Sequence, residues 1–433
     1  MKKMTPLRSF KHQVMLYLSN LASILWYYLI NNNDKYCKSI MQSSLPFSLK
    51  IDSMRRVYNE YAYIDKNKTI ESQPNPDLVF LARRLTPDII KDIVAIRAKN
   101  NNIRILVLCK ENNLTKEISN DLIDEIIEWK YYYDLIKLIE KINPKTLVLI
   151  RRGNSAGIIL GTILFKGKLI YRPWPFAYIM QSKIGYVKKI DLIGEKYIIE
   201  NCDGVYHFFH NEINKELGKY IKITCPFIQI FPGCVKQIEE YSSTLVHKKL
   251  SENDKELHIV YAAGLYRKAG FTKRTSYLYS FKYKFEQIIK NKIHLHVYTP
   301  YLTEADLHKD FIDLNKSKYF HLEKTLEYHD LIVEMRKYDF AMYHFDYSNF
   351  PTRNKFDWFA SNAFFTYIQS GLPIIVSNTT PGLSELVIQN NIGLSNNDND
   401  FSDIKYQLEK NVKEAQKTFK HNANDLIKLF LNK

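Results

Sequence analysis

A glycine followed by two basic side chains comes directly after a predicted strand in the second half of the chain. The strand is predicted over 257–262, and Gly264, Arg267 and Lys268 follow it. Glycine lets the backbone turn tightly beside a ligand, because it has no Cβ atom. Arginine can bind a phosphate through two parallel N–H groups, and lysine supplies a point charge. The loop is therefore suited to neutralising a diphosphate, although short basic loops also occur by chance on solvated surfaces.

A second polar loop follows a strand predicted over 374–376. The helix before that strand is expected to end at Gly371, and Pro373 prevents its continuation. Three consecutive β-branched residues are typical of a buried parallel strand. Ligands of open α/β sheets bind just past the carboxyl ends of strands, so this loop is expected to contact phosphate or sugar oxygens. Its candidate residues are Ser377, Asn378, Thr379, Thr380, Gly382 and Glu385, the last of which could instead only cap the next helix.

Polar side chains also follow predicted strands over 145–150, 169–171 and 340–343. His344 and Asp346 come after the last of these and could bind the hydroxyl groups of a ligand. The candidates in the first half of the chain, which could meet a second substrate, are Arg151, Arg152, Asn154 and Arg172. For Arg172 the alternative is a surface arginine beside a proline-rich turn.

The predicted elements alternate between strands and helices twice along the chain. Short apolar runs separated by amphipathic segments predict parallel β-α-β units, with one long helix expected over 121–142. The predicted division is a helical extension over 1–74, a first Rossmann-like domain over 75–235, a polar linker over 236–256, a second Rossmann-like domain over 257–402 and a last helix over 403–433 that crosses back to the first domain. The fold class is therefore α/β.

The segment around the glycine–proline pair resembles the nucleotide-sugar-binding half of GT-B glycosyltransferases, in particular the group 1 family. The matching residues are Asn362, Phe365, Tyr367, Gly371, Pro373, Gly382 and Glu385. The chain departs from the family pattern at Ala363, Gln369 and Thr366. The two glutamates that the family spaces eight residues apart would fall on Trp358 and Thr366, and neither residue is acidic. The resemblance covers about 130 residues well and the rest of the chain loosely.

This resemblance implies two Rossmann-like domains facing a cleft, and it implies roles for the residues above. Arg267 and Lys268 would stabilise the leaving diphosphate, with Gly264 beside them, and Thr366 would stand where the donor ribose is held. His344 and Asp346 would approach the sugar or the nucleobase. The first domain would supply the acceptor side. No Asp-x-Asp metal motif occurs in a suitable loop, so a reaction without a metal or other cofactor is expected.

Composition sets further bounds on the class of protein. The 433 residues carry 62 Lys and Arg against 46 Asp and Glu, a formal net charge of +16. This charge suits nucleic acid, a membrane surface or a phosphorylated substrate, but no nucleic-acid motif is present, so no nucleic-acid partner is expected. The five cysteines are odd in number and contain no C-x-x-C pair, which indicates a reducing compartment and neither a disulfide scaffold nor a zinc site.

The apolar stretch 14–30 follows several basic residues and raises the question of a membrane anchor. Ser19, Asn20 and Ser23 interrupt it, and it is shorter than the about 20 residues that a typical span requires. We therefore expect an amphipathic helix that packs on the protein, with peripheral contact to a membrane and a true membrane span as the alternatives.

Together these patterns predict a cytosolic glycosyltransferase, soluble or associated with the inner face of a membrane. It would move a sugar from a nucleotide-diphosphate donor to a hydroxyl group of a glycan, lipid-linked or protein acceptor. The rivals are a sugar-phosphate epimerase or phosphorylase on the same fold, and a non-catalytic protein that binds a glycan or another partner. Arg267 and Lys268 favour the enzyme, whereas Trp358 and Thr366 favour the non-catalytic alternative.

Overall fold

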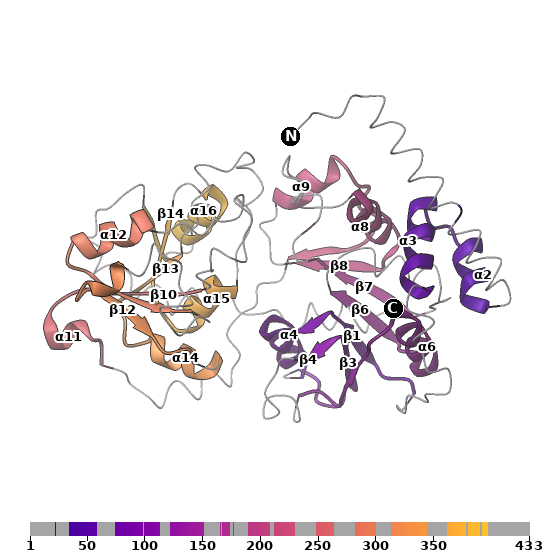
Figure 1. Cartoon of the computed structure of the whole chain (residues 1–433), viewed down its shortest axis with the longest axis horizontal. Coiled ribbons are helices and arrows are strands. Elements are labelled where there is room, and N and C mark those ends of the chain that lie inside the picture. Colours follow the sequence, from indigo (N-terminus) through magenta and orange to yellow (C-terminus); the bar gives the residue numbers. More distant parts are fainter. Residues whose placement is uncertain are drawn as a thin grey trace.

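The computed structural model of the chain describes it in segments. They comprise residues 22, 34–58, 74–97, 99–112, 122–150, 165, 167–173, 176, 189–207, 212–229, 248–263, 282–299, 313–326, 328–343, 362–377, 380–389 and 392–396. Figure 1 shows two β-sheets in two lobes, each flanked by helices. Most of the stretch 14–30, the start of the linker over 236–247 and the helix expected over 403–433 lie outside the described segments. Within those segments, no helix is long and apolar enough to cross a membrane.

In the described segments, two helices precede the first sheet and pack on the helices that cover it. They are α2 (Lys35–Gln42) and α3 (Phe47–Tyr58). The Asp34 carboxylate caps α2 by accepting hydrogen bonds from two backbone N–H groups of its first turn. The Tyr36 hydroxyl donates a hydrogen bond to the Glu140 carboxylate in the first domain, over 2.6 Å. The described part of the N-terminal extension is therefore helical, as predicted.

The first sheet has seven parallel strands in the order β5-β3-β1-β6-β7-β8-β9. They are β1 (Leu78–Leu81), β3 (Ile105–Cys109), β5 (Glu125–Glu128), β6 (Thr146–Ile150), β7 (Lys168–Arg172), β8 (Gly204–His207) and β9 (Phe227–Gln229). Apolar residues of α4 (Pro87–Arg97) bury one face, and those of α6 (Tyr132–Ile142) and α8 (Lys189–Asn201) bury the other. The short strands β2 (Arg84–Leu85) and β4 (Glu111–Asn112) pair apart from this sheet, and α9 (Glu212–Gly218) precedes β9. The strand order reverses between β1 and β6, as in a doubly wound Rossmann-like sheet.

The second sheet has six parallel strands in the order β12-β11-β10-β13-β14-β15. They are β10 (His258–Ala262), β11 (His294–Tyr298), β12 (Phe320–Glu323), β13 (Phe340–Tyr343), β14 (Ile374–Ser377) and β15 (Gly393–Asn396). The helices in the described part of this lobe are α11 (Ser251–Asp254), α12 (Lys282–Lys290), α14 (Tyr328–Met335), α15 (Asn362–Gln369) and α16 (Pro381–Gln389), with a 3-10 turn at Leu314–Lys316. Here the strand order reverses between β10 and β13, so the two predicted Rossmann-like sheets are both present.

The segment 121–142 differs from the single helix that we predicted. Its first part forms the edge strand β5, parallel to β3, and the helix begins only at Tyr132. A short apolar run such as Ile126–Ile127 fits a strand and a helix equally well in sequence. The exposed edge of β3 decides between them, because it offers backbone partners that a helix would leave unused.

The last part of the predicted linker belongs to the second lobe. It contains α11, and the Leu250 N–H donates a hydrogen bond to the Lys337 carbonyl over 2.9 Å. The Ser251 hydroxyl donates to the Asp339 carboxylate just before β13, over 2.6 Å. These bonds fix the chain to the second sheet before β10 begins.

Candidate functional site

Three of the predicted ligand loops follow strands that are neighbours in the second sheet. β10, β13 and β14 lie side by side, and all three run parallel. Their carboxyl ends therefore meet at one edge, on both sides of the point where the strand order reverses, which is where doubly wound sheets bind ligands. The residues expected there that fall outside the described segments are Gly264, Arg267, Lys268, His344, Asp346, Asn378 and Thr379. Each of these residues follows the described end of one of the three strands closely in the sequence.

The helix stop before β14 has the conformation that the sequence predicts. Gly371 has a φ of 73°, in the left-handed region that favours glycine. The N–H groups of Gly371 and Leu372 donate hydrogen bonds to the carbonyls of Ile368 and Tyr367, over 3.0 and 3.1 Å. These bonds satisfy carbonyl groups at the end of α15 and turn the chain directly into β14.

The hydroxyl of Tyr367 joins the helix α15 to the end of β10. It accepts a hydrogen bond from the Ala262 N–H over 2.8 Å, and the tyrosine side chain is fully buried. Burial raises the pKa of Tyr367, so its hydroxyl stays protonated. Ala262 is the last residue of β10 and lies two residues before Gly264. Tyr367 therefore fixes the point from which the basic loop departs, a role that its match to the family pattern did not reveal.

The loop after β14 is held together at its described ends. The Thr380 hydroxyl donates a hydrogen bond to the Ser377 carbonyl over 2.7 Å, and both residues are buried. Helix α16 starts at Pro381, and the Ser384 N–H donates a hydrogen bond to the Thr380 carbonyl. The N–H groups at the start of a helix have no intrahelical acceptor, so the first turn around Gly382 is suited to an anion.

Thr366 and Glu385 differ in how accessible their side chains are. Thr366, in α15, is 5% exposed, and its carbonyl accepts a hydrogen bond from the Ser370 hydroxyl over 2.8 Å. Glu385 is exposed on α16 and accepts a hydrogen bond from the Gln389 side chain over 2.8 Å. The contacts of these two residues with a donor stay predictions.

Arg172 corrects our expectation that it presents its guanidinium group to a cleft. Its side chain is 1% exposed at the end of β7, and its Nε lies 2.8 Å from the Asp92 carboxylate of α4. The Tyr206 hydroxyl donates a hydrogen bond to the same carboxylate over 2.9 Å, and the guanidinium lies over the Tyr206 ring. A charge buried in this way is stabilised by its partner, so the ion pair joins α4 to the sheet.

The other acceptor-side candidates follow β6, the strand next to β7. β6 ends at Ile150, directly before Arg151, so the position at a strand carboxyl end is as predicted. Arg151, Arg152 and Asn154 themselves lie outside the described residues.

The comparisons with known proteins identify the fold. No protein-family model and no curated protein matches the sequence. Sucrose-phosphate synthase from Thermosynechococcus elongatus matches with a TM-score of 0.56 and 11% identity, over 83% of this chain and 98% of that chain. The chain has a GT-B fold.

Two further solved structures agree with this assignment. A glycosyltransferase from Rickettsia africae has a TM-score of 0.50 and 11% identity, over 83% of this chain and 99% of its own. HepE from Anabaena, solved in complex with UDP-glucose, has a TM-score of 0.50 and 8% identity, over 82% of this chain and 92% of its own. At identities this low the likeness shows the fold alone, and it agrees with the two parallel sheets of the structure.

Proposed function

We propose that the chain is a glycosyltransferase that takes a sugar from a nucleotide-diphosphate donor and transfers it to a hydroxyl group of a glycan, lipid-linked or protein acceptor. The observation that carries the proposal is the arrangement of β10, β13 and β14. Their carboxyl ends are neighbours at one edge of the sheet. In the sequence, the basic loop follows β10, the pair His344 and Asp346 follows β13, and α16 follows β14. Solved GT-B structures that resemble the chain include enzymes named for sugar transfer.

The proposed chemistry places the donor on the second domain. Arg267 and Lys268 offset the charge that develops on the departing diphosphate, which lowers the barrier to breaking the sugar–phosphate bond. The first turn of α16 adds N–H groups aimed at an anion. His344 and Asp346 bind hydroxyl groups of the donor sugar, and Tyr367 acts as a positioning residue through Ala262.

The first domain is proposed to hold the acceptor through Arg151, Arg152 and Asn154. Bringing the two substrates together in one orientation is itself a large part of the rate enhancement for a transfer reaction. We propose that the reaction needs no catalytic metal, because two basic side chains can carry the charge of the leaving group. Equal turnover with and without added Mg²⁺ or Mn²⁺ supports this, and strict dependence on either ion contradicts it.

The first test is binding of the donor nucleotide to the whole chain. Thermal unfolding is measured with UDP, GDP, ADP, CDP and CMP, since a ligand that binds only the folded state raises its stability. The double variant Arg267→Ala/Lys268→Ala should weaken binding of the selected nucleoside diphosphate by about 2–4 kcal/mol, taking about 1.5–3 kcal/mol for each charged hydrogen bond without full additivity. Binding of the nucleoside alone should change much less.

A matched control removes the same charge elsewhere on the second domain. Lys290 and Lys316 are exposed, so Lys290→Ala/Lys316→Ala should leave nucleotide affinity unchanged. Equal affinities in the two double variants would exclude the assigned diphosphate loop. Transfer is then followed as release of the nucleoside diphosphate with and without an acceptor, because an epimerase interconverts sugars without one.

A further inference from the structure

Four histidines of the second domain meet at the amino ends of three neighbouring strands. His258 opens β10, His294 and His296 lie in β11, and His321 lies in β12. The parallel register pairs His258 with His294 and His296 with His321. Residues two apart in a strand share a face, so all four rings lie on one face of the sheet. The rings of His258 and His294 stack with centroids 4.5 Å apart, and those of His296 and His321 with centroids 4.4 Å apart.

One chain of hydrogen bonds runs through two of these rings from carboxylate to carboxylate. The Asp254 carboxylate lies 2.9 Å from His258 Nε2, and His258 Nδ1 lies 2.9 Å from His296 Nε2. His296 Nδ1 then lies 2.7 Å from the Glu323 carboxylate. Both rings are buried, with side-chain exposures of 6% and 7%.

This series of three hydrogen bonds needs more ring protons than two neutral imidazoles carry. Three bonds between two ionised carboxylates need three ring protons, and two neutral imidazoles carry only two. A metal ion on His258 Nε2 removes the shortage. The His258 Nδ1–H then donates to His296 Nε2, the His296 Nδ1–H donates to Glu323, and Asp254 binds the metal.

The rings of His294 and His321 can also adopt the proton arrangement that a metal ion requires. His294 Nε2 lies 2.5 Å from the Glu256 carboxylate, and His294 Nδ1 lies 2.8 Å from His321 Nε2. When His294 Nε2 binds a metal, its Nδ1–H donates to His321 Nε2. Histidine ligands in metal sites nearly always donate their other N–H group in this way, which fixes the tautomer and the orientation of the ring.

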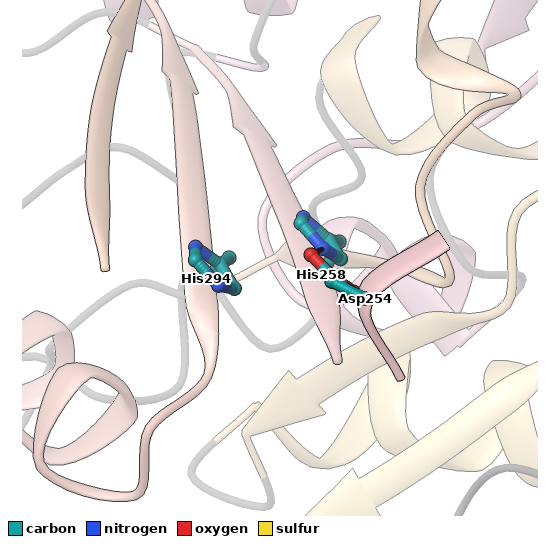
Figure 2. Close-up of side chains that lie close together, drawn as sticks. All are labelled: Asp254, His258 and His294. Carbon is teal, nitrogen blue, oxygen red and sulfur yellow. Dashed lines mark hydrogen bonds and ion pairs between the residues drawn. The ribbon is translucent and has the colours of Figure 1, made fainter. Parts of the chain in front are cut away.

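We propose that Asp254, His258 and His294 form a binding site for Zn²⁺, with His296 and His321 as the hydrogen-bond partners that orient the two ligand rings. Figure 2 shows the three side chains side by side, from α11, β10 and β11. Their ligand atoms lie within 4.8 Å of one another. Imidazole and carboxylate are the ligands that zinc combines in proteins, whereas Ca²⁺ and Mg²⁺ prefer oxygen alone.

Zinc binding requires a small local rearrangement. At Zn–N distances of about 2.0–2.1 Å, the ligand atoms of a tetrahedral site lie about 3.4 Å apart. The two rings are tilted by only 6°, so their lone pairs run nearly parallel, and one ring must tilt for both to reach one ion. The Asp254 side chain is 43% exposed at the end of the four-residue helix α11, where it can follow the ion. The ion would replace the hydrogen bond between His294 Nε2 and the Glu256 carboxylate.

The site lies at the edge of the sheet opposite to the proposed donor loops, because it occupies amino ends of parallel strands. It therefore stands independently of the proposed glycosyl transfer. The ion would join α11 to β10 and β11, at the place where the chain enters the second domain from the linker. Its role would be to hold the start of the second domain in place.

Zinc binding to the full chain tests the site. After dialysis against a chelator, titration with Zn²⁺ alone should show about one ion per chain, and Zn²⁺ should raise the unfolding temperature while Mg²⁺ should not. Asp254→Asn and His294→Gln should each weaken zinc binding at least tenfold and reduce the thermal shift. His296→Gln removes an orienting partner and should weaken binding about 10–100-fold.

Two variants separate loss of the zinc site from misfolding and from zinc binding elsewhere. Asp254 is largely exposed, so Asp254→Asn should fold even where a histidine variant does not. The thiols of Cys202 and Cys225 lie 3.6 Å apart in the first domain and are a rival zinc site, so Cys225→Ser serves as the control and should bind zinc like the natural protein. Absence of zinc binding, equal affinity in Asp254→Asn, or loss of binding in Cys225→Ser would each overturn the proposal.

Discussion

The hydroxyl of Tyr367 connects the helix that ends at Gly371 to the strand end that precedes the basic loop. Replacing Tyr367 with phenylalanine leaves the half-buried Ala262 N–H without its acceptor. A hydrogen bond of this kind contributes about 0.5–1.5 kcal/mol, so Tyr367→Phe should lower the free energy of unfolding by this amount. Because Ala262 lies directly before the loop with Gly264, affinity for the donor nucleotide should fall as well. Urea unfolding and nucleotide titration measure the two effects.

Tyr220 provides the control for this change. It is 50% exposed, so water can replace any bond that its hydroxyl makes, and Tyr220→Phe should change stability by less than about 0.5 kcal/mol. Nucleotide affinity unchanged in Tyr367→Phe would show that the tyrosine supports only the fold.

Arg172 is a second residue whose surroundings decide its role. Replacing it with methionine removes the guanidinium group from the buried Asp92 carboxylate. Breaking a buried ion pair from one side costs about 3–5 kcal/mol, and we expect that loss in urea unfolding of Arg172→Met. Lys35 pairs with Glu140 on the surface, with exposures of 65% and 44%, so Lys35→Met should cost no more than about 1 kcal/mol. A fully stable Arg172→Met variant that no longer transfers sugar would restore the acceptor role that we first expected.

At the scale of elements, the position of β14 depends on its close contact with β15. A Cβ atom on Gly393 would lie 1.9 Å from the Ile374 carbonyl oxygen and 2.6 Å from the Ile374 nitrogen. These are backbone atoms, so the two strands must separate. Overpacking of this kind costs about 1–3 kcal/mol, and Gly393→Ala should lower the free energy of unfolding accordingly. Since β14 leads into the Ser377 loop, nucleotide affinity should fall in parallel.

Gly218, at the end of α9, is the matched control for the same substitution. A Cβ atom there would meet nothing within 4 Å. Gly218→Ala should therefore change stability by no more than about 0.5 kcal/mol. Similar losses for the two glycines would show that the contact between β14 and β15 is not the cause of the effect.

At the scale of the whole molecule, the net charge of +16 is the property that most affects its partners. Basic residues attract anionic lipid surfaces, and salt screens this attraction over a Debye length of about 10 Å at 0.1 M. We predict that protein found in a membrane fraction is released by high salt or carbonate, because polar residues interrupt the stretch 14–30. The amounts in the wash and in the pellet measure this, with an integral membrane protein as the control. Protein that needs detergent for release would show that 14–30 anchors the chain.

The sequence by itself determined the α/β class, the two Rossmann-like units and the strand ends that carry polar loops. These follow from local chemistry. A glycine with φ of 73° and a following proline end α15 wherever it packs, and β-branched runs favour buried strands. The helix expected over 121–142 was wrong in its first half, because a short apolar run does not by itself distinguish a strand from a helix.

Only the tertiary structure decided which distant residues meet. It buried Arg172 against Asp92, although a strand end alone suggested an exposed side chain, because the facing helix α4 supplies the counter-charge. It also gathered the histidines of β10, β11 and β12. The pattern His294-Leu-His296 indicates that two rings share a strand face, but sequence does not say which strands are neighbours. Pairing partners are set by the packing of the whole sheet, and a site built across several strands is therefore visible only once the sheet order is known.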